Sequence, residues 1–182
     1  MLPITIPATE KYNELTNEFI YRKEQKLLLE HSLVSLSKWE SKWHKPFLSS
    51  KKDSKTQEET IDYVRCMTIT QNVDPAVYYD LTPDNYAKIQ AYIDDPMTAT
   101  TFSDIQKGRP NFEIITSELI YYWMIAYNVP VEFEKWHLNR LLTLIKVCSI
   151  KNTPPKKMSK KEIMSRNAAL NASRRLAHNS RG

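Results

Sequence analysis

The chain has 182 residues, of which 41% are hydrophobic and 26% charged, and its formal net charge is +5. This composition is typical of one folded domain with tails and lies outside the disordered range. Only two residues are glycine, which excludes glycine-rich phosphate loops and therefore Rossmann and P-loop nucleotide enzymes. The scarcity of glycine also favours helices over a sheet built on tight hairpins.

The positive charge is concentrated at the C-terminus. Residues 151–182 contain nine lysines or arginines and one glutamate, a net charge of +8, so residues 1–150 carry −3. The sequence therefore predicts a mildly acidic folded part with a basic C-terminal appendage. The N-terminus lacks the pattern of a signal peptide, and the longest apolar run, residues 119–126, is too short to span a bilayer. We expect a soluble intracellular protein without membrane contact, and we expect Cys66 and Cys148 to be reduced core thiols.

Residues 1–31 are expected to form an N-terminal arm with a small β element. Residues 2–7, LPITIP, alternate in polarity between prolines, which predicts a short extended segment. Residues 18–22 and 26–30 have strand-like ends around a charged centre, which predicts a β-hairpin between them.

Residues 32–150 are predicted to form a helical core domain, so the fold class is mainly α. Ser32 is expected to cap a helix that ends near His44 or Lys45, ahead of Pro46. Further helices are expected over residues 58–70 and 84–93, opened by Thr56 and Thr82, and a turn or a short helix is expected from Asp74-Pro75 through Tyr79. Residues 49–57 and 97–113 are expected to form loops.

The stretch from Ser117 to Cys148 is predicted to form a central helical hairpin, and the rest of a compact domain is expected to pack around it. Its first helix, residues 118–127 with Ser117 as N-cap, is apolar almost all round, which is typical of a helix buried inside a domain. Its second helix, residues 131–149, begins after Pro130 and is amphipathic.

Residues 151–182 are predicted to form a linker and an extended basic C-terminal helix. Ser159 is expected to cap this helix, which runs from Lys160 to about His178. Its apolar stripe is too sparse to stabilise an isolated helix. We therefore expect the helix to lie on a partner or to stay partly disordered.

No motif in the sequence predicts catalysis. The four histidines lack metal-ligand spacing, and the adjacent carboxylates at residues 58–59 and 94–95 point in different directions. His137 fits either a satisfied helix histidine or a general base whose nucleophile the sequence does not identify. We expect no enzyme activity, no metal site and no cofactor.

Two groups of residues are candidates for partner binding. Trp39 and Trp43 lie four residues apart beside Phe47, a pattern that fits core packing or an exposed interaction patch. The basic tail fits a solvated assembly arm that meets an acidic partner, or a surface that neutralises nucleic-acid phosphates. It contains no aromatic residue on which bases could stack. The candidate basic residues are Lys156, Lys157, Lys160, Lys161, Arg174 and Arg175.

Several segments resemble a family of viral proteins. The segments SLSKWESKWHKPFL (35–48) and ETIDYVRCMT (59–68), the stretch 117–148 and the basic ending are similar to tail-morphogenesis proteins of tailed bacteriophages. These proteins are described as tail assembly chaperones or minor tail-associated proteins. The resemblance implies a small helical protein of the host cytoplasm that holds the long tape measure protein until the tail tube polymerises.

The resemblance leaves one alternative open, and it transfers no residue-level site. A structural virion subunit in the tail, baseplate or head–tail connector would share the same segments and would be located in the virion. In both cases other phage tail proteins are the implied partners, and the chain is expected to be an oligomer or part of a larger assembly.

Overall fold

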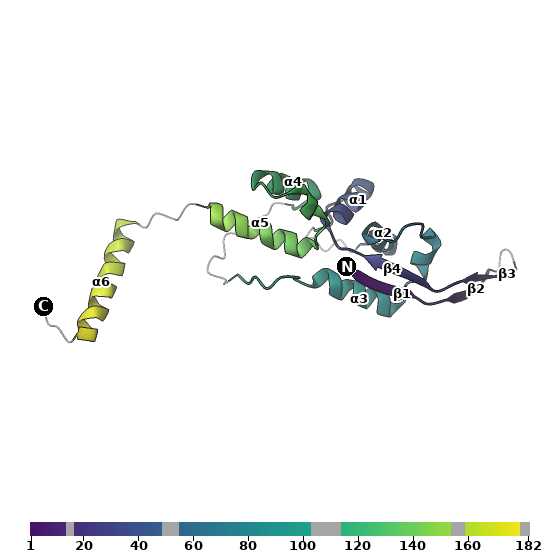
Figure 1. Cartoon of the computed structure of the whole chain (residues 1–182), viewed down its shortest axis with the longest axis horizontal. Helices are drawn as coiled ribbons and strands as arrows, with labels where there is room; N and C mark the ends of the chain where they lie inside the picture. The colour runs from purple at the N-terminus through teal and green to yellow at the C-terminus, as the bar shows by residue number, and fades with distance from the viewer. Residues whose placement is uncertain (14–16, 49–54, 103–113, 154–158, 179–182) are drawn as a thin grey trace. The chain divides into compact units, whose positions relative to one another are not determined.

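The computed structural model describes residues 1–13, 17–48, 55–102, 114–153 and 159–178 (Figure 1). The chain divides into two compact units, Met1–Ser149 and Ile150–Gly182. It is mostly helical, with a small β element at its N-terminus. Among the described residues, no helix is both long enough and apolar enough to cross a membrane.

Four short strands form two antiparallel pairs at the N-terminus: β1 (Leu2–Ile6), β2 (Thr9–Asn13), β3 (Glu18–Arg22) and β4 (Gln25–Leu29). Strand β1 pairs with β4, and β2 pairs with β3. The predicted extended segment at 2–7 and the strand at 18–22 are confirmed, but the predicted pairing of 18–22 with 26–30 is wrong. The chain reverses between β2 and β3, where Asn17 has a φ of 57°, a conformation that asparagine tolerates better than most residues.

The three predicted helices that follow Ser32, Thr56 and Thr82 are present, with side-chain caps at their N-termini. Ser32, Thr56 and Thr82 each accept a backbone hydrogen bond from the residue three positions on, as the capping motifs predict. The α-helices up to residue 152 are α1 (Leu33–Trp43), α2 (Gln57–Met67), α3 (Pro83–Asp94), α4 (Ser117–Ala126) and α5 (Leu138–Asn152). The 3₁₀ helices are η1 (Pro75–Asp80) and η2 (Val131–Lys135).

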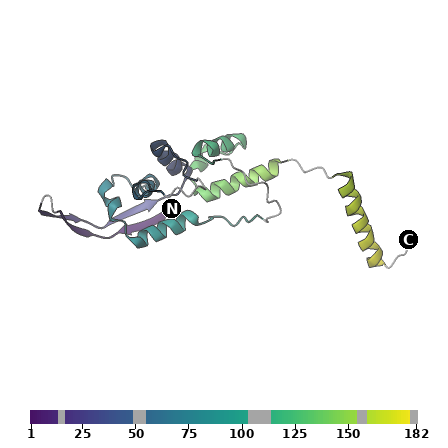
Figure 2. The ribbon, with the colours of Figure 1, turned by 180° about the vertical axis from the view of Figure 1, so that it is seen from behind.

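Two apolar clusters form the core, and helix α1 contributes to both. Trp39 packs in the first cluster, with side chains of β1, β4, α2, η1 and α3. Leu33 and Leu36 pack in the second, with side chains of α4 and α5. Figures 1 and 2 show α3 beside β1, where Asn85 Nδ2 donates to the carbonyl of Thr5 at 3.1 Å. Strands β1 and β4 therefore share a core with the helices, whereas no described side chain of β2 or β3 contributes to the first cluster.

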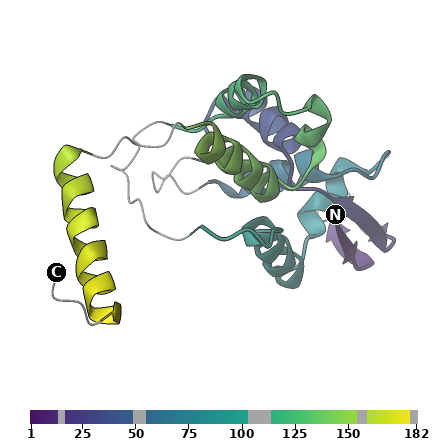
Figure 3. The ribbon, with the colours of Figure 1, turned by 60° about the vertical axis from the view of Figure 1, so that its left-hand side comes forward.

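The stretch 117–148 differs from the expected pair of long helices. Thr116, and not Ser117, caps α4. The second predicted helix is divided into η2 and α5, because the backbone at Trp136 is extended, with φ −70° and ψ 161°. Helix α4 is not buried in the middle of the domain, since Tyr122 and Ile125 are exposed. Figure 3 shows α4 and α5 together with α1 on one side of the unit.

The buried carboxylate of Glu40 joins α1 to α4. Glu40 Oε2 accepts the backbone N–H of Ser117 at 2.7 Å, and Oε1 accepts the N–H of Phe47 at 2.8 Å. The Ser117 N–H belongs to the first turn of α4, where an unpaired donor and the positive end of the helix dipole both favour an anion. One carboxylate therefore fixes the start of α4 and the chain that leaves α1.

Replacing Glu40 by alanine should destabilise the first unit. The substitution leaves two backbone N–H groups without partners, and we expect the free energy of unfolding to fall by about 2–5 kcal/mol. Urea denaturation followed by circular dichroism measures the change. Glu132→Ala on η2, an exposed position, is the matched control. Equal stability of the two variants would contradict this role for Glu40.

The second unit contains the predicted basic helix, α6 (Lys160–His178). Ser159 Oγ accepts the N–H of Glu162 at 3.2 Å, and the Glu162 carboxylate accepts the N–H of Ser159 at 2.8 Å, so the predicted cap is confirmed. Every residue of α6 is exposed.

Candidate partner-binding site

The aromatic group predicted around Trp39 is part of the core. Trp39 is 1% exposed, and its Nε1 donates to the carbonyl of Glu59 at 2.8 Å. Phe47 is half-buried and stacks on Tyr63, with ring centroids 3.9 Å apart. Trp39 therefore follows the core-packing interpretation, and no partner can reach its indole without opening the first cluster.

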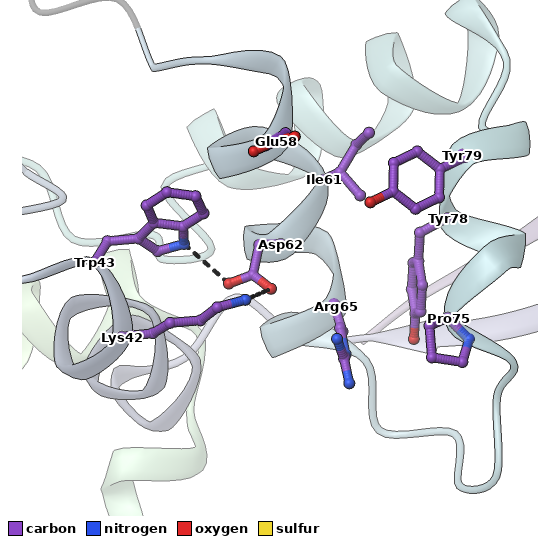
Figure 4. A pocket seen from close by; sticks show the side chains of 9 residues that line it. All are labelled: Lys42, Trp43, Glu58, Ile61, Asp62, Arg65, Pro75, Tyr78 and Tyr79. Atoms are coloured by element: carbon purple, nitrogen blue, oxygen red, sulfur yellow. Dashed lines mark hydrogen bonds and ion pairs between the residues drawn. The ribbon is translucent and has the colours of Figure 1, made fainter.

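Trp43 is half-buried and lines a cleft between α1, α2 and η1 (Figure 4). The cleft has a volume of about 240 Å³. Aromatic side chains of η1, Tyr78 and Tyr79, form the wall opposite Trp43, and Lys42 and Arg65 bring positive charge to it. The remaining lining residues are Glu58, Ile61, Asp62 and Pro75.

The carboxylate of Asp62 holds the two α1 side chains of this cleft in place. Trp43 Nε1 donates to Asp62 Oδ2 at 3.0 Å, and Lys42 Nζ donates to Oδ1 (Figure 4). Because both carboxylate oxygens are engaged, Asp62 has a positioning role in this arrangement. The cleft offers an aromatic wall and an exposed guanidinium, which suits binding a side chain or short segment of another protein.

The candidate basic residues lie in the second unit. Lys160, Lys161, Arg174 and Arg175 are exposed on α6. Lys156 and Lys157 lie outside the described residues.

Sequence reasoning missed a third surface, on the ribbon formed by β2 and β3. The register places Tyr12 opposite Phe19 and Glu10 opposite Tyr21, so these four side chains share one face. Tyr12, Phe19 and Tyr21 are 50%, 68% and 73% exposed, and the rings of Tyr12 and Phe19 lie 5.1 Å apart. We call this the aromatic face of the ribbon. The run of three large apolar residues in EFIYR was the available signal, but it identifies a face only once β2 is known as the partner strand.

Asp80 anchors the opposite face of the ribbon to the domain. Its carboxylate accepts Lys11 Nζ and Arg22 Nη1, both at 2.5 Å, and the hydroxyl of Thr9 at 3.2 Å. Burial raises the pKa of Asp80, but the hydrogen bonds from Lys11 and Arg22 outweigh it and hold the pKa below its ordinary value. The anchor leaves the aromatic face directed away from the domain.

Replacing Asp80 by alanine should release the ribbon without unfolding the domain. We expect faster amide hydrogen exchange over residues 9–13 and 18–22, because a two-stranded ribbon without packing is marginally stable. Protection in β1 and β4 should persist, since both strands contribute buried side chains to the first cluster. Asp84→Ala on α3, which removes an exposed ion pair with Lys88, is the control. Uniform loss of protection through all four strands would contradict a local anchor.

Two buried histidines lie where α5 meets the end of β4. The rings of His31 and His137 are 5.1 Å apart. His137 Nε2 donates to the carbonyl of Tyr92 at 2.9 Å, and its buried Nδ1 has no partner. His31 Nδ1 lies 2.5 Å from the hydroxyl of Tyr63. The arrangement places two imidazole rings in the core, and among the described residues no serine, cysteine or carboxylate side chain is hydrogen-bonded to His137 Nδ1.

Acid should destabilise the first unit through His31. Burial and the neighbouring His137 lower the pKa of His31 from 6.5 to about 4, against a smaller opposing effect of Asp94. Between these two pH values the unfolded chain binds a proton that the folded chain does not, so stability falls as pH decreases, by about 3 kcal/mol in all.

Urea denaturation at a series of pH values measures this dependence. His31→Gln should flatten the dependence between pH 6.5 and about 4, while His178→Gln, on exposed α6, should leave it unchanged. An unchanged slope in His31→Gln would show that another group is responsible.

Among the described residues, no group of three or more histidine, cysteine, aspartate or glutamate side chains is arranged to hold a metal ion. Comparison with protein-family models, curated proteins and solved structures found no match for this chain.

Proposed function

We propose that this chain is a non-enzymatic assembly protein of a tailed bacteriophage, a tail assembly chaperone that binds a helical tail protein such as the tape measure protein. The resemblance of its sequence segments to tail-morphogenesis proteins supports the class of assembly. The exposed aromatic face of the ribbon supports the binding role. On this proposal the protein acts in the host cytoplasm while tails are being built.

The aromatic face suits a helical client for physical reasons. Tyrosine and phenylalanine bury a large apolar area with few rotatable bonds, so their immobilisation on binding costs little entropy. Tyr12, Phe19 and Tyr21 present that area on a ribbon whose other face is already held by Asp80. An amphipathic client helix would lay residues spaced three and four apart across this face.

Helix η1 holds the face of the ribbon opposite the aromatic face, and it also lines the Trp43 cleft. Asp80 anchors the ribbon, and its neighbour Tyr79 lines the cleft and is exposed. The cleft is therefore a second surface for a client, separate from the aromatic face, with an aromatic wall and the guanidinium of Arg65.

Site-specific photo-crosslinking tests the proposal. A benzophenone amino acid at Phe19 or Tyr21, introduced during phage infection, should capture the tape measure protein, identified by mass spectrometry. The same group at Lys88, exposed on α3, is the control and should not capture it. Tyr12→Ser with Tyr21→Ser should reduce co-purification of that protein while leaving the circular dichroism spectrum unchanged.

Mass spectrometry of purified particles separates the two candidate roles. A chaperone should be absent from finished virions. Presence at a fixed symmetric copy number would instead support a structural subunit of the tail, baseplate or connector. That alternative is favoured by α6, a long helix whose residues are all exposed in its own unit and which suits attachment to a neighbouring subunit. Absence from virions together with no captured tail protein would refute both roles.

A further inference from the structure

Helix α4 has a second face that the core does not use. Ile120 and Met124 are buried, whereas Tyr122 is 63% and Ile125 is 76% exposed. Steps of four and three residues bring Glu118, Tyr122 and Ile125 into one line on the outer side of the helix. We call these three residues the outer stripe of α4. It combines two large apolar side chains with one carboxylate.

Helix α6 carries the complementary features. Met164, Ala168, Ala172 and Leu176 recur every four residues, and Met164 and Leu176 are 73% and 84% exposed. The small side chains of Ala168 and Ala172 line a shallow depression that Arg175 and Leu176 border. A large side chain of another helix can enter such a depression, as a ridge packs into a groove.

The charges of the two parts of the chain are also complementary. Residues 1–150 carry a net charge of −3 and residues 151–182 carry +8. Charge of opposite sign steers two surfaces together and disfavours alternative partners of like charge. A basic amphipathic helix is therefore the kind of occupant that an apolar stripe with a carboxylate accepts.

We propose that α6 of one copy docks on the outer stripe of α4 of a second copy. Tyr122 enters the depression at Ala168 and Ala172, Ile125 packs beside it, and Arg175 lies next to Glu118. The two surfaces are different, so the contact is head-to-tail, and a pair of copies keeps one free surface of each kind. Further copies add until the assembly closes into a ring or continues as a filament.

Two double variants and their mixture test this arrangement by sedimentation velocity of the full chain. The α4 variant is Tyr122→Ser with Ile125→Ser, and the α6 variant is Met164→Ser with Leu176→Ser. Wild type should form oligomers whose mass rises with concentration, and each variant alone should associate about tenfold or more weakly. An equimolar mixture of the two variants should form one-to-one dimers and nothing larger, because each pair retains a single intact interface.

Charge exchange tests the placement of Arg175 beside Glu118. Glu118→Lys and Arg175→Glu should each weaken association, and the chain carrying both changes should recover it. Tyr21→Ser on the ribbon should leave association unchanged, so loss of client binding and loss of self-association are separate results. All substituted positions are exposed, and circular dichroism verifies that each variant is folded.

Three results would overturn the proposal. The first is a wild-type chain that stays monomeric up to high micromolar concentrations, as it would if α6 bound its own copy or only another protein. The second is undiminished association of either double variant. The third is a mixture of the two variants that forms no dimer.

Discussion

Helix α1 is the element on which the rest of the first unit depends, because it is buried against two separate apolar clusters. Trp39 packs with β1, β4, α2 and α3, while Leu33 and Leu36 pack with α4 and α5. The Glu40 carboxylate then ties the end of α1 to the start of α4. Neither cluster is complete without α1, so its packing positions β1, β4 and α2 in the first cluster and α4 and α5 in the second.

This arrangement separates stability from recognition. The surfaces proposed to bind partners are the aromatic face of the ribbon and the outer stripe of α4, and both lie on elements whose opposite face is held in the unit. Asp80 holds the ribbon, and Ile120 and Met124 hold α4. A rigid support lowers the entropy lost when these exposed side chains are immobilised by a partner. The same exposure makes them aggregation hazards in isolation, which explains why a partner would be needed to cover them.

The local elements were largely predictable from the sequence, whereas their partners were not. Capping residues such as Ser32, Thr56 and Thr82 predicted helix starts, because a side-chain cap acts within three residues of its own position. The predicted pairing of residues 18–22 with 26–30 is wrong. Strand β4 pairs instead with β1, which is distant in the sequence, and burial of one face of these two strands determines that pairing rather than a nearby turn. Trp39 fitted both a core and a surface position until its indole was placed against Glu59.

The sequence by itself determined the mainly helical class, the starts of the helices capped by Ser32, Thr56, Thr82 and Ser159, and the division between a mildly acidic domain and a basic C-terminal helix. These follow from interactions within a few residues and from composition. Only the tertiary structure decided which apolar side chains are buried: α4 is apolar almost all round, yet Tyr122 and Ile125 are exposed. Burial depends on which elements pack on each face, and that is decided by contacts between residues far apart in the chain, such as Glu40 with Ser117 and Asp80 with Arg22.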